Sequence, residues 1–544
     1  MNAALSTWPR VIREAGDAAL LVELGPAIDE RVNARAIALA RAIRQAAIPG
    51  VRDVVSTYRS VAVFFHPLRT QLEELSAMIE RAPDDPRRGF KARTVDVRVA
   101  YGGVHGPDLG AVARHAGLTE SEVVARHASR DYAVFMLGFM PGFPYLGGLD
   151  SAIAMPRKPT PRAKVPAGSV GIAGTQTGIY PSETPGGWNL IGRTDAVLFD
   201  IERRQPSLVS PGDRIRFVPV DAVQPPPRVR DPELTCDSGR CVFVDEPGLL
   251  TTIQDAGRWG YQDMGVPVAG PMDPVAHRLA NRLVGNREDW AALEITVVGP
   301  VLRLGCDATL AVTGADLSAM MGSTPMTLNQ PIQAVAGTTL RFGSRRTGAR
   351  AYVAFGGGVE TPLVLRSRAV HLPSGLGSPA RPFRAGDAFQ IGVPLGNPVR
   401  TSGSPSAAPR GGARLRVLPG PHVDSFDSAV LDALQRQRFR IDAESNRMGY
   451  RLKGASHLHT SEADMISDAA FTGAIQVPPS GDPILLMADR PTTGGYPQIA
   501  TVISADLPLA GQLAPGDWLE FVVCSRAEAL TALIAQERAL LGVG

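Results

Sequence analysis

Between Asp131 and about Val220 the chain consists of short apolar runs separated by glycine and proline. Glycine permits positive φ angles and proline fixes φ, so each separator favours a turn. The chain of 544 residues holds 57 glycines and 46 prolines, above the average usage of about 7% and 5%. Short strands divided by frequent turns are typical of β-barrels and sandwiches. The pattern therefore predicts a mainly β protein.

The first part of the chain has a different pattern. Residues 10–95 alternate two extended pairs with two helical stretches. The helical spacing places Val32, Ile37, Ala40 and Ile43 near one face of the first helix. This alternation predicts a small α+β domain of the ferredoxin-like kind. The expected fold class is thus mainly β with an α+β N-terminal domain.

Two stretches without apolar periodicity divide the chain. One contains a triple proline and the other is rich in Ser, Pro, Gly and Ala, as is typical of linkers. A Gly-Asp turn before an alternating strand occurs at 210–217, 384–391 and 514–521, which favours repeated barrels. The expected division is an α+β domain at 1–95, a barrel at 96–220, a linker at 221–235, a barrel region at 236–399, a linker at 400–413 and a further barrel region at 414–544.

Charge and hydropathy argue against several functional classes. The formal net charge is +3 and is mixed along the chain, so we expect no nucleic-acid partner. No apolar run approaches 18 residues and the N-terminus lacks a signal-peptide layout, so we expect a cytoplasmic protein without a membrane segment. The four cysteines are too few and too scattered for a disulfide framework, and only Cys236 and Cys241 are close enough in sequence for a local pair. This cysteine usage fits a reducing compartment.

The densest group of candidate binding residues lies in the proline-rich segment 138–195. Four cations of this segment suit a phosphate or a carboxylate, because Arg gives bidentate contacts and Lys a point charge. A solvated basic loop would show the same charge pattern. The cations are Arg157, Lys158, Arg162 and Lys164, and the other polar or aromatic candidates are Gln176, Tyr180, Trp188 and Arg193.

A second candidate group follows the strand-like run PILLMA, where a strand end would deliver side chains to a loop. Its members are Asp489, Arg490, Thr492 and Tyr496. His457 and His459 could share one face of a strand, but no third ligand lies nearby, so surface histidines are the simpler interpretation. No CxxC, HExxH, GxSxG or GxxxxGK[ST] motif occurs. The residues thus identify neither a metal site nor a catalytic group.

Long motifs resemble a known protein family. GFMPGFPYLGGL, PRKPTPRAKVPAGSVGIAGTQTGIYP and TPGGWNLIGRT resemble the first of allophanate hydrolase subunits 1 and 2, also called the B and C subunits of bacterial ATP-dependent 5-oxoprolinase. TTIQDAGRWGYQDMGVPVAGPMD, SNRMGYRL and ILLMADRPTTGGYPQIATV resemble the second. The resemblance covers nearly the whole chain except the linkers. It implies a B–C fusion with tandem cyclophilin-like β-barrels after a small α+β domain.

The same resemblance implies ATP-driven opening of the lactam 5-oxoproline to glutamate. It implies ATP and Mg²⁺ as cofactors and a separate A subunit of the LamB/YcsF type as partner, without which the chain is expected to be inactive. Phosphorylation of the lactam carbonyl oxygen would create a leaving group, and positioned cations would offset the developing negative charge. Residues 157–164 and Arg193 are the candidates for that role.

Two other functions share part of the resemblance. Similar barrels form a carboxyltransferase-like component of biotin-dependent urea amidolyase, although no biotin-attachment Met-Lys signal occurs in this chain. The B-like family also includes regulatory proteins that inhibit a sporulation sensor histidine kinase. Homo-oligomer formation stays open. Residues 366–384 depart from the family pattern, so the contacts of that loop are not predicted.

Overall fold

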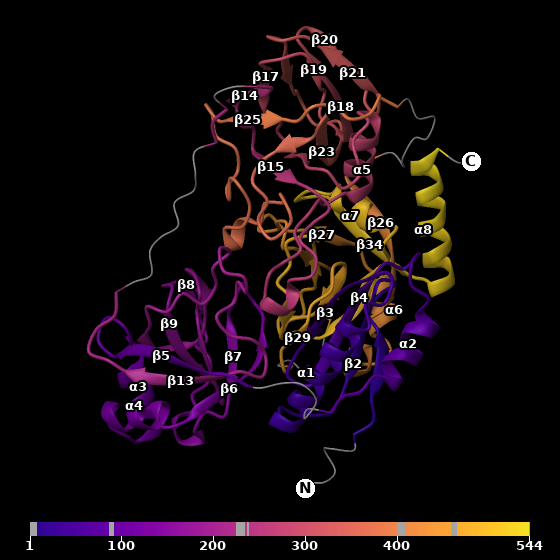
Figure 1. Cartoon of the computed structure of the whole chain (residues 1–544). Coiled ribbons are helices and arrows are strands. Elements are labelled where there is room, and N and C mark those ends of the chain that lie inside the picture. The colour runs from indigo at the N-terminus through magenta and orange to yellow at the C-terminus, as the bar shows by residue number, and fades with distance from the viewer. Residues whose placement is uncertain are drawn as a thin grey trace.

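The computed structural model describes residues 8–85, 92–224, 234–236, 239–399, 408–458 and 465–542 (Figure 1). His459 and the greater part of both expected linkers lie outside these ranges. The chain forms an N-terminal sheet domain, a first barrel, an upper unit and a second barrel. Figure 1 shows the indigo N-terminal domain against the yellow second barrel, with the purple first barrel beside them and the upper unit above.

The N-terminal domain is a four-stranded sheet of order β1-β2-β4-β3 in which all neighbours are antiparallel. Asp29 caps its first helix by accepting the N–H groups of Arg31 and Val32. The chain order is ββαββα, whereas the ferredoxin-like order is βαββαβ. The elements are β1 (Val11–Glu14), β2 (Ala19–Glu23), α1 (Glu30–Gln45), β3 (Val51–Ser56), β4 (Ser60–Phe65) and α2 (Leu72–Arg81).

The first barrel is a closed ring of seven strands. Its last strand, β13, pairs parallel with its first strand, β5, and this pairing closes the ring. Two helices pack on the ring, and Thr119 with Glu122 forms a complete capping box on the second. The elements are β5 (Thr94–Tyr101), α3 (Leu109–Ala116), α4 (Glu120–Ala128), β6 (Asp131–Leu137), β7 (Pro144–Gly147), η2 (Ser151–Ile153), β8 (Arg162–Val165), β9 (Ser169–Ala173), β10 (Gln176–Ile179), β11 (Thr184–Gly186), β12 (Asn189–Arg193) and β13 (Arg214–Pro219).

The upper unit consists of a seven-stranded and a five-stranded sheet around one core. Its last strand pairs antiparallel with its first, and its described strands form two open sheets instead of the ring expected for 236–399. The elements are β14 (Cys241–Glu246), β15 (Leu250–Gln254), η3 (Gln262–Met264), α5 (Pro274–Leu283), β16 (Ala292–Thr296), β17 (Val301–Leu304), β18 (Ala308–Asp316), β19 (Met320–Met321), β20 (Thr324–Pro325), β21 (Pro331–Ala334), β22 (Thr339–Arg341), β23 (Thr347–Phe355), β24 (Val359–Glu360), η4 (Leu372–Ser374) and β25 (Ala388–Ile391).

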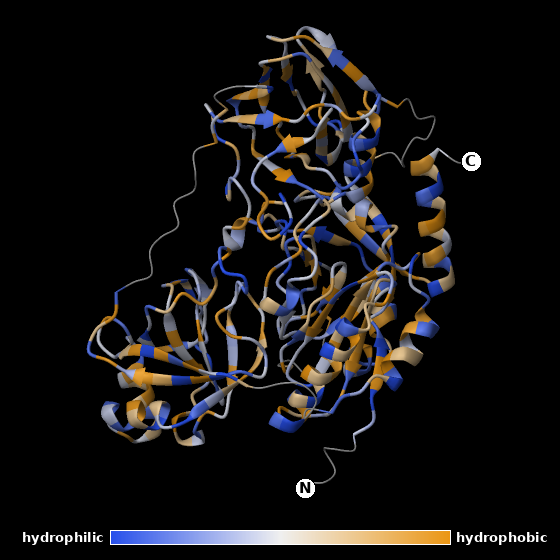
Figure 2. Ribbon diagram, in the orientation of Figure 1, coloured by the Kyte–Doolittle hydropathy of each residue, from blue (hydrophilic) through white to orange (hydrophobic). Residues whose placement is uncertain are grey.

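The second barrel is again a closed ring of seven strands whose first and last members, β26 and β34, pair parallel. Hydrophobic residues, orange in Figure 2, follow the strands of both rings. The elements are β26 (Gly412–Pro419), η5 (Val423–Ser425), α6 (Val430–Gln435), β27 (Phe439–Ile441), β28 (Gly449–Lys453), β29 (Asp468–Ala469), β30 (Ala474–Gln476), β31 (Ile484–Leu486), β32 (Thr493–Gly494), β33 (Gln498–Val502), α7 (Leu507–Gly511), β34 (Trp518–Val523) and α8 (Arg526–Leu541).

The two barrels have the same topology. Around each ring the strands follow the order first, sixth, fourth, fifth, third, second and seventh in the chain. Each barrel also carries a two-stranded ribbon between corresponding strands, β8 with β11 in the first barrel and β29 with β32 in the second. The ribbon sequences TPGGWNLIG at 184–192 and TTGGYPQIA at 492–500 align in these positions. The mainly β fold with two barrels after an α+β domain is therefore confirmed.

The Gly-Asp turns share one geometry in all three units. A carboxylate oxygen of Asp213, Asp387 and Asp517 accepts the backbone N–H three residues earlier, at 2.9, 2.7 and 2.9 Å. Each aspartate also forms an ion pair with an arginine of its surroundings. Aspartate favours such turns because its short side chain reaches nearby backbone N–H groups. The turn therefore sets the start of the last strand of each unit.

The cysteines and helices add two observations. Cys236 and Cys241 are joined by a disulfide, while Cys306 and Cys524 are free thiols. The described part of the chain contains no helix that is both long and apolar enough to cross a bilayer.

Candidate functional site

A cavity of about 220 Å³ lies where three parts of the chain meet. The N-terminal sheet contributes Arg52 and Phe64, the segment before α5 contributes Trp259, and the second barrel contributes Phe471 and Arg490. Each of these parts is far from the others in sequence. The cavity is thus a product of how the units pack.

The N-terminal sheet can form a wall because both of its faces are buried. Side chains alternate between faces along a strand. Val63 and Phe65 of β4 pack under the helices, whereas Ala62 and Phe64 pack against the second barrel. The alternation of SVAVFF therefore directs Phe64 into the cavity, where it meets Phe471.

Aromatic rings and guanidinium groups line the cavity together with an acidic side chain, Asp17, which accepts from the Ser504 hydroxyl at 2.8 Å. The ring of Phe64 lies 5.4 Å from that of Phe471 and 6.5 Å from that of Trp259, measured between centroids. The guanidinium carbon of Arg490 lies 5.5 Å from the Phe64 ring centre, and that of Arg52 lies 5.0 Å from the Trp259 ring centre. Such cation–π contacts orient a cation without neutralising it. Both groups therefore keep their charge available to an anion.

Arg490 is a buried cation held by neutral groups. It is only 2% exposed, and burial lowers its pKa to about 10, while Asp53 acts in the opposite direction. Its guanidinium donates to Thr472 Oγ1, the Pro491 carbonyl and Gln262 Oε1 at 3.0, 3.2 and 2.8 Å. Among the described residues no carboxylate lies within ion-pair distance of Arg490. Because an unpaired buried charge is costly, the site favours an incoming anion.

A carboxylate of the N-terminal domain supports Arg490 indirectly. Asp53 Oδ2 accepts the Gly260 N–H at 3.0 Å and both the backbone N–H and Nε2 of Gln262 at 3.2 Å. Gln262 in turn accepts from Arg490. The chain of hydrogen bonds therefore runs from the N-terminal domain through η3 to the second barrel and fixes the guanidinium.

Asp489, beside Arg490, serves an ion-pair network. Arg447 binds Asp489 through Nε and Nη2 at 2.9 and 2.8 Å and also pairs with Glu294. Asp489 and Glu294 are 2% and 1% exposed. The network joins the second barrel to the upper unit, so Asp489 is placed to stabilise their contact.

The divergent loop 366–384 packs against the same region. Asp255 accepts from the Ser367 hydroxyl and the Arg368 N–H, both at 2.6 Å. His371 Nε2 lies 3.3 Å from the Asp489 carbonyl. The loop therefore covers the back of the 489–490 turn.

The basic segment of the first barrel is largely committed to internal contacts. Lys158 Nζ and Arg162 Nη2 both contact Asp108 Oδ1, at 2.9 and 2.7 Å. Asp108 Oδ2 accepts the Leu190 N–H at 2.7 Å. Lys164 pairs with Glu183 at the surface, 3.2 Å apart. Arg157 is exposed and has no ion pair with any described residue.

The remaining predicted residues lie in separate places. Tyr180 and Trp188 are 2% and 6% exposed and pack with Phe143 in an aromatic cluster. Arg193 donates to the Ala167 carbonyl at 2.8 Å. Thr492 is buried, Tyr496 is 38% exposed, and Gln176 lines a separate cavity of about 430 Å³. Of the residues that the sequence suggested, only Arg490 lines the cavity at the domain junction.

Comparison with known proteins gives matches for both halves of the chain. Residues 10–209 match the family described as carboxyltransferase domain, subdomain C and D, and residues 264–523 match subdomain A and B. Over 219 residues the chain is 39% identical to the 5-oxoprolinase B subunit of Bacillus subtilis, covering 38% of this chain and 91% of that protein. Over 292 residues it is 37% identical to the 5-oxoprolinase C subunit of Escherichia coli, covering 54% and 94%.

Solved structures extend the likeness to nearly the whole chain. The crystal structure of TTHA0988 is 36% identical with a TM-score of 0.84, covering 94% of this chain and 100% of that one. The chain belongs to the family of 5-oxoprolinase B and C subunits. Urea amidolyase of Kluyveromyces lactis is 30% identical with a TM-score of 0.52, but the match covers 56% of this chain and 20% of that protein.

As a fusion within this 5-oxoprolinase family, the chain builds the cavity from both halves. Arg52 and Phe64 belong to the B-like half, whereas Phe471 and Arg490 belong to the C-like half. Sequence reasoning missed Arg52, Phe64 and Trp259. The signal that could have found Trp259 is its place in the family motif TTIQDAGRWGYQD, in a chain with five tryptophans.

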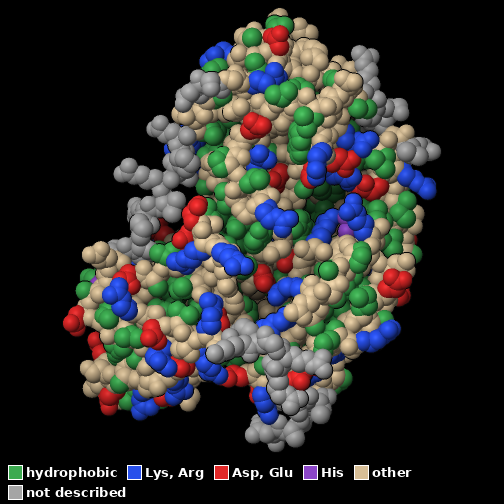
Figure 3. Space-filling view, in the orientation of Figure 1, with side chains coloured by type: hydrophobic (Ala, Val, Ile, Leu, Met, Phe, Trp, Pro, Cys, Tyr) green, Lys and Arg blue, Asp and Glu red, His purple; other side chains and the backbone are tan. Residues whose placement is uncertain are grey.

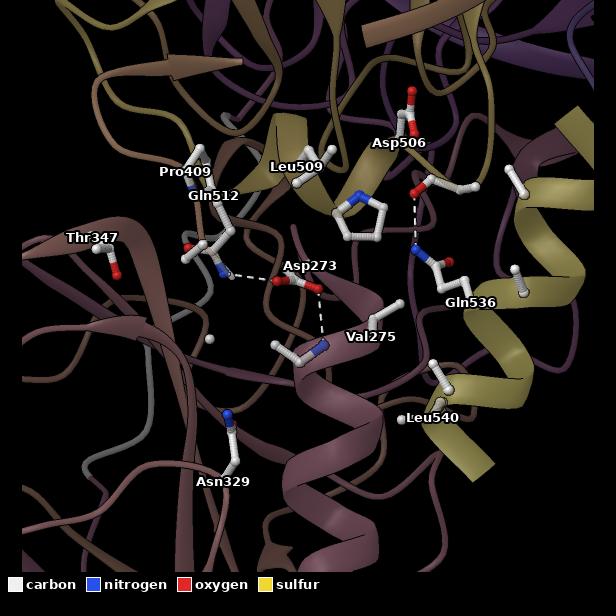
Figure 4. Close-up of a pocket in the computed structure, with 18 of the residues that line it drawn as sticks. Asp273, Val275, Asn329, Thr347, Pro409, Asp506, Leu509, Gln512, Gln536 and Leu540 are labelled. Atoms are coloured by element: carbon white, nitrogen blue, oxygen red, sulfur yellow. Dashed lines mark hydrogen bonds between the residues drawn. The ribbon is translucent and has the colours of Figure 1, made fainter. Parts of the chain in front are cut away.

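The polyphosphate of ATP, which the family implies, does not fit the cavity of about 600 Å³ between α8 and α5, because Asp273 and Asp506 line it. Its arginine, Arg416, is held by Asp506 at 2.6 Å, and Figure 4 shows Asp273 engaged with Gln512 and the start of α5. Carboxylates repel a polyphosphate. In the described ranges no three His, Cys, Asp or Glu side chains gather as metal ligands.

Proposed function

We propose that this chain is the B–C component of an ATP-dependent 5-oxoprolinase and that the cavity at the junction of its halves holds 5-oxoproline. The observation that carries the proposal is the pair Arg52 and Arg490, one from each half, in a cavity with aromatic walls. The cavity is complete only when the B-like and C-like halves are in contact. Joining the halves in one chain keeps them together.

The chemistry of the cavity matches that of the ligand. 5-Oxoproline is a small lactam ring with one carboxylate. Arginine binds carboxylates through charge-assisted hydrogen bonds, and Phe64, Trp259 and Phe471 offer apolar faces to the ring. The volume of about 220 Å³ is below the roughly 300–1,000 Å³ of drug-sized pockets. The cavity therefore favours a ligand of this size.

We place the carboxylate of 5-oxoproline at Arg490 and the ring over Phe64. The carboxylate would neutralise a cation that burial has already desolvated, so binding at this position gains more than it would at the surface. Burial of the ring also excludes water from the lactam. We route no chemical step through ATP on this chain and assign activation and hydrolysis to the complex with the A-type partner.

The first test is direct binding. Titration calorimetry of 5-oxoproline into the chain alone is expected to show binding, and Arg490→Lys is expected to weaken it by at least about tenfold because the planar fork of the guanidinium is lost. Arg341→Lys, an exposed residue of β22, is the matched control and should bind like the wild type. Absence of binding to the wild-type chain would overturn the assignment of the cavity.

The second test is turnover. ADP release that depends on 5-oxoproline is expected only when a LamB/YcsF-type partner is added to the chain. Full turnover by the chain alone would show that the hydrolytic step has been misplaced.

A carboxyltransferase function is the second candidate, because both matching families are described as carboxyltransferase domains. It predicts decarboxylation of free carboxybiotin by the chain, accelerated by a urea-like acceptor. The 5-oxoprolinase proposal predicts neither effect.

A further inference from the structure

Arg52 lines the cavity, and further basic side chains lie near it on neighbouring elements. Arg52 lies on β3, His66 and Arg69 lie in the turn after β4, and Arg278 lies on α5. Burial lowers the pKa of Arg52, and Arg69 and Arg278 lower it further. The pKa of His66 falls to about 4 through burial and then through Arg52 and Arg69. The turn that holds His66 and Arg69 is bonded to the chain just before Arg52, because the His66 N–H donates to the Gly50 carbonyl at 2.8 Å and the Thr70 hydroxyl donates to the Pro49 carbonyl at 2.9 Å.

The local charges do not balance. Arg278 is neutralised by Glu288 and Glu537, which it contacts at 2.7 and 2.5 Å. No carboxylate of the described residues lies within ion-pair distance of Arg52 or Arg69, and neither guanidinium has a hydrogen bond to them. Arg52 and Arg69 are therefore neighbouring cations whose side-chain donors are not engaged by any described residue.

The shape of the surface supports the same conclusion. On the face shown in Figure 3, blue Lys and Arg side chains and a purple His gather around a hollow between the N-terminal domain and the upper part of the molecule. The guanidinium carbon of Arg52 lies 5.0 Å from the centre of the Trp259 ring, and Arg52 is an exposed residue that lines the cavity. Its donors therefore lie at the boundary between cavity and solvent.

We propose that Arg52 and Arg69 form a second anion site, which binds a phosphate group at the cavity mouth. This inference rests on the proposed function, because a phosphate next to the lactam is the group that ATP-dependent activation would transfer. Arg490 at the inner end and Arg52 at the outer end then contact two different anions of one bound species.

The test uses inorganic phosphate as the probe and calorimetry or tryptophan fluorescence as the readout. Phosphate is expected to bind the wild-type chain, and Arg69→Met and Arg52→Met are each expected to weaken binding about tenfold, as loss of one charge-assisted contact would. Arg69 is exposed and outside the cavity lining, so its removal leaves the fold intact. Arg341→Met is the matched control and should bind phosphate like the wild type.

Parallel titrations separate this proposal from the previous one. If 5-oxoproline binds with its dependence on Arg490 while phosphate binding is absent, or is equally weak in the Arg341→Met control, the phosphate site is overturned and the substrate site stands. Binding of phosphate that tightens in the presence of 5-oxoproline supports a phosphate carried beside the lactam. ADP that binds much more tightly than phosphate, with the same dependence on Arg69, supports the site and assigns its phosphate to a nucleotide.

Discussion

Asp108 decides what the basic segment of the first barrel does. It is 5% exposed and receives Lys158 and Arg162 on one oxygen. Arg162→Met should lower the free energy of unfolding by about 1–3 kcal/mol, because a buried carboxylate loses a charged donor. Lys158→Met should cost less, since Arg162 still holds the same oxygen. Urea denaturation of both variants measures this, and unchanged unfolding together with a reduced reconstituted rate would instead favour a phosphate contact.

The same carboxylate predicts a response to acid. Burial raises the pKa of Asp108, but hydrogen bonds from Arg162 and Lys158 outweigh it and hold the pKa below its usual value. A depressed pKa stabilises the fold above the unfolded-state value near about 3.9 and loses that contribution as pH falls through the folded value. In Asp108→Asn, the free energy of unfolding should therefore fall less steeply as the pH is lowered below about 4. An equally steep fall in the variant would contradict the prediction.

At the scale of the element, the Gly-Asp turn is the feature that all three units share. Asp517 accepts the Ala514 N–H at 2.9 Å and pairs with Arg345 at 2.6 Å. Asp517→Ala should lower the free energy of unfolding by about 2–3 kcal/mol, because both donors lose a buried acceptor. Asp517→Asn keeps an oxygen for the backbone N–H and should lose less. Equal losses in urea titrations of the two variants would argue against the turn contact.

The whole molecule depends on contacts between the B-like and C-like halves. Asp17 accepts from Ser504, and Asp468 accepts from Thr57 at 3.2 Å and from Ser60 at 2.5 Å. Cleavage between Pro227 and Pro232, which lie outside the described residues, should therefore leave two halves that co-elute in size-exclusion chromatography. These hydrogen bonds join the two halves directly and do not involve the linker, so cutting the linker leaves them in place. Elution as separate halves at micromolar concentration would contradict this account of the interface.

The sequence by itself determined the local features of the fold. Alternation in SVAVFF predicted a strand and the spacing of Thr119 and Glu122 predicted a capping box, and both are confirmed. Gly and Pro between short apolar runs predicted a mainly β fold of the barrel or sandwich kind, because such residues act on their own backbone angles. The long motifs identified the B–C family. Each of these signals lies in residues that are close together in the sequence, so it can be recognised in a single sequence.

Only the tertiary structure decided which charges are available to a ligand. Lys158 and Arg162 looked free in sequence, yet their partner Asp108 lies 54 residues from Arg162. Asp53 supports Arg490 through Gln262, which is 209 residues away from Asp53. The two open sheets of the upper unit likewise depend on which strands pair at long range. The charge of a side chain follows from its residue type, but whether a partner neutralises that charge depends on the distance between them in space. When the partner belongs to another packed unit, the spacing of the two residues in the sequence does not give that distance.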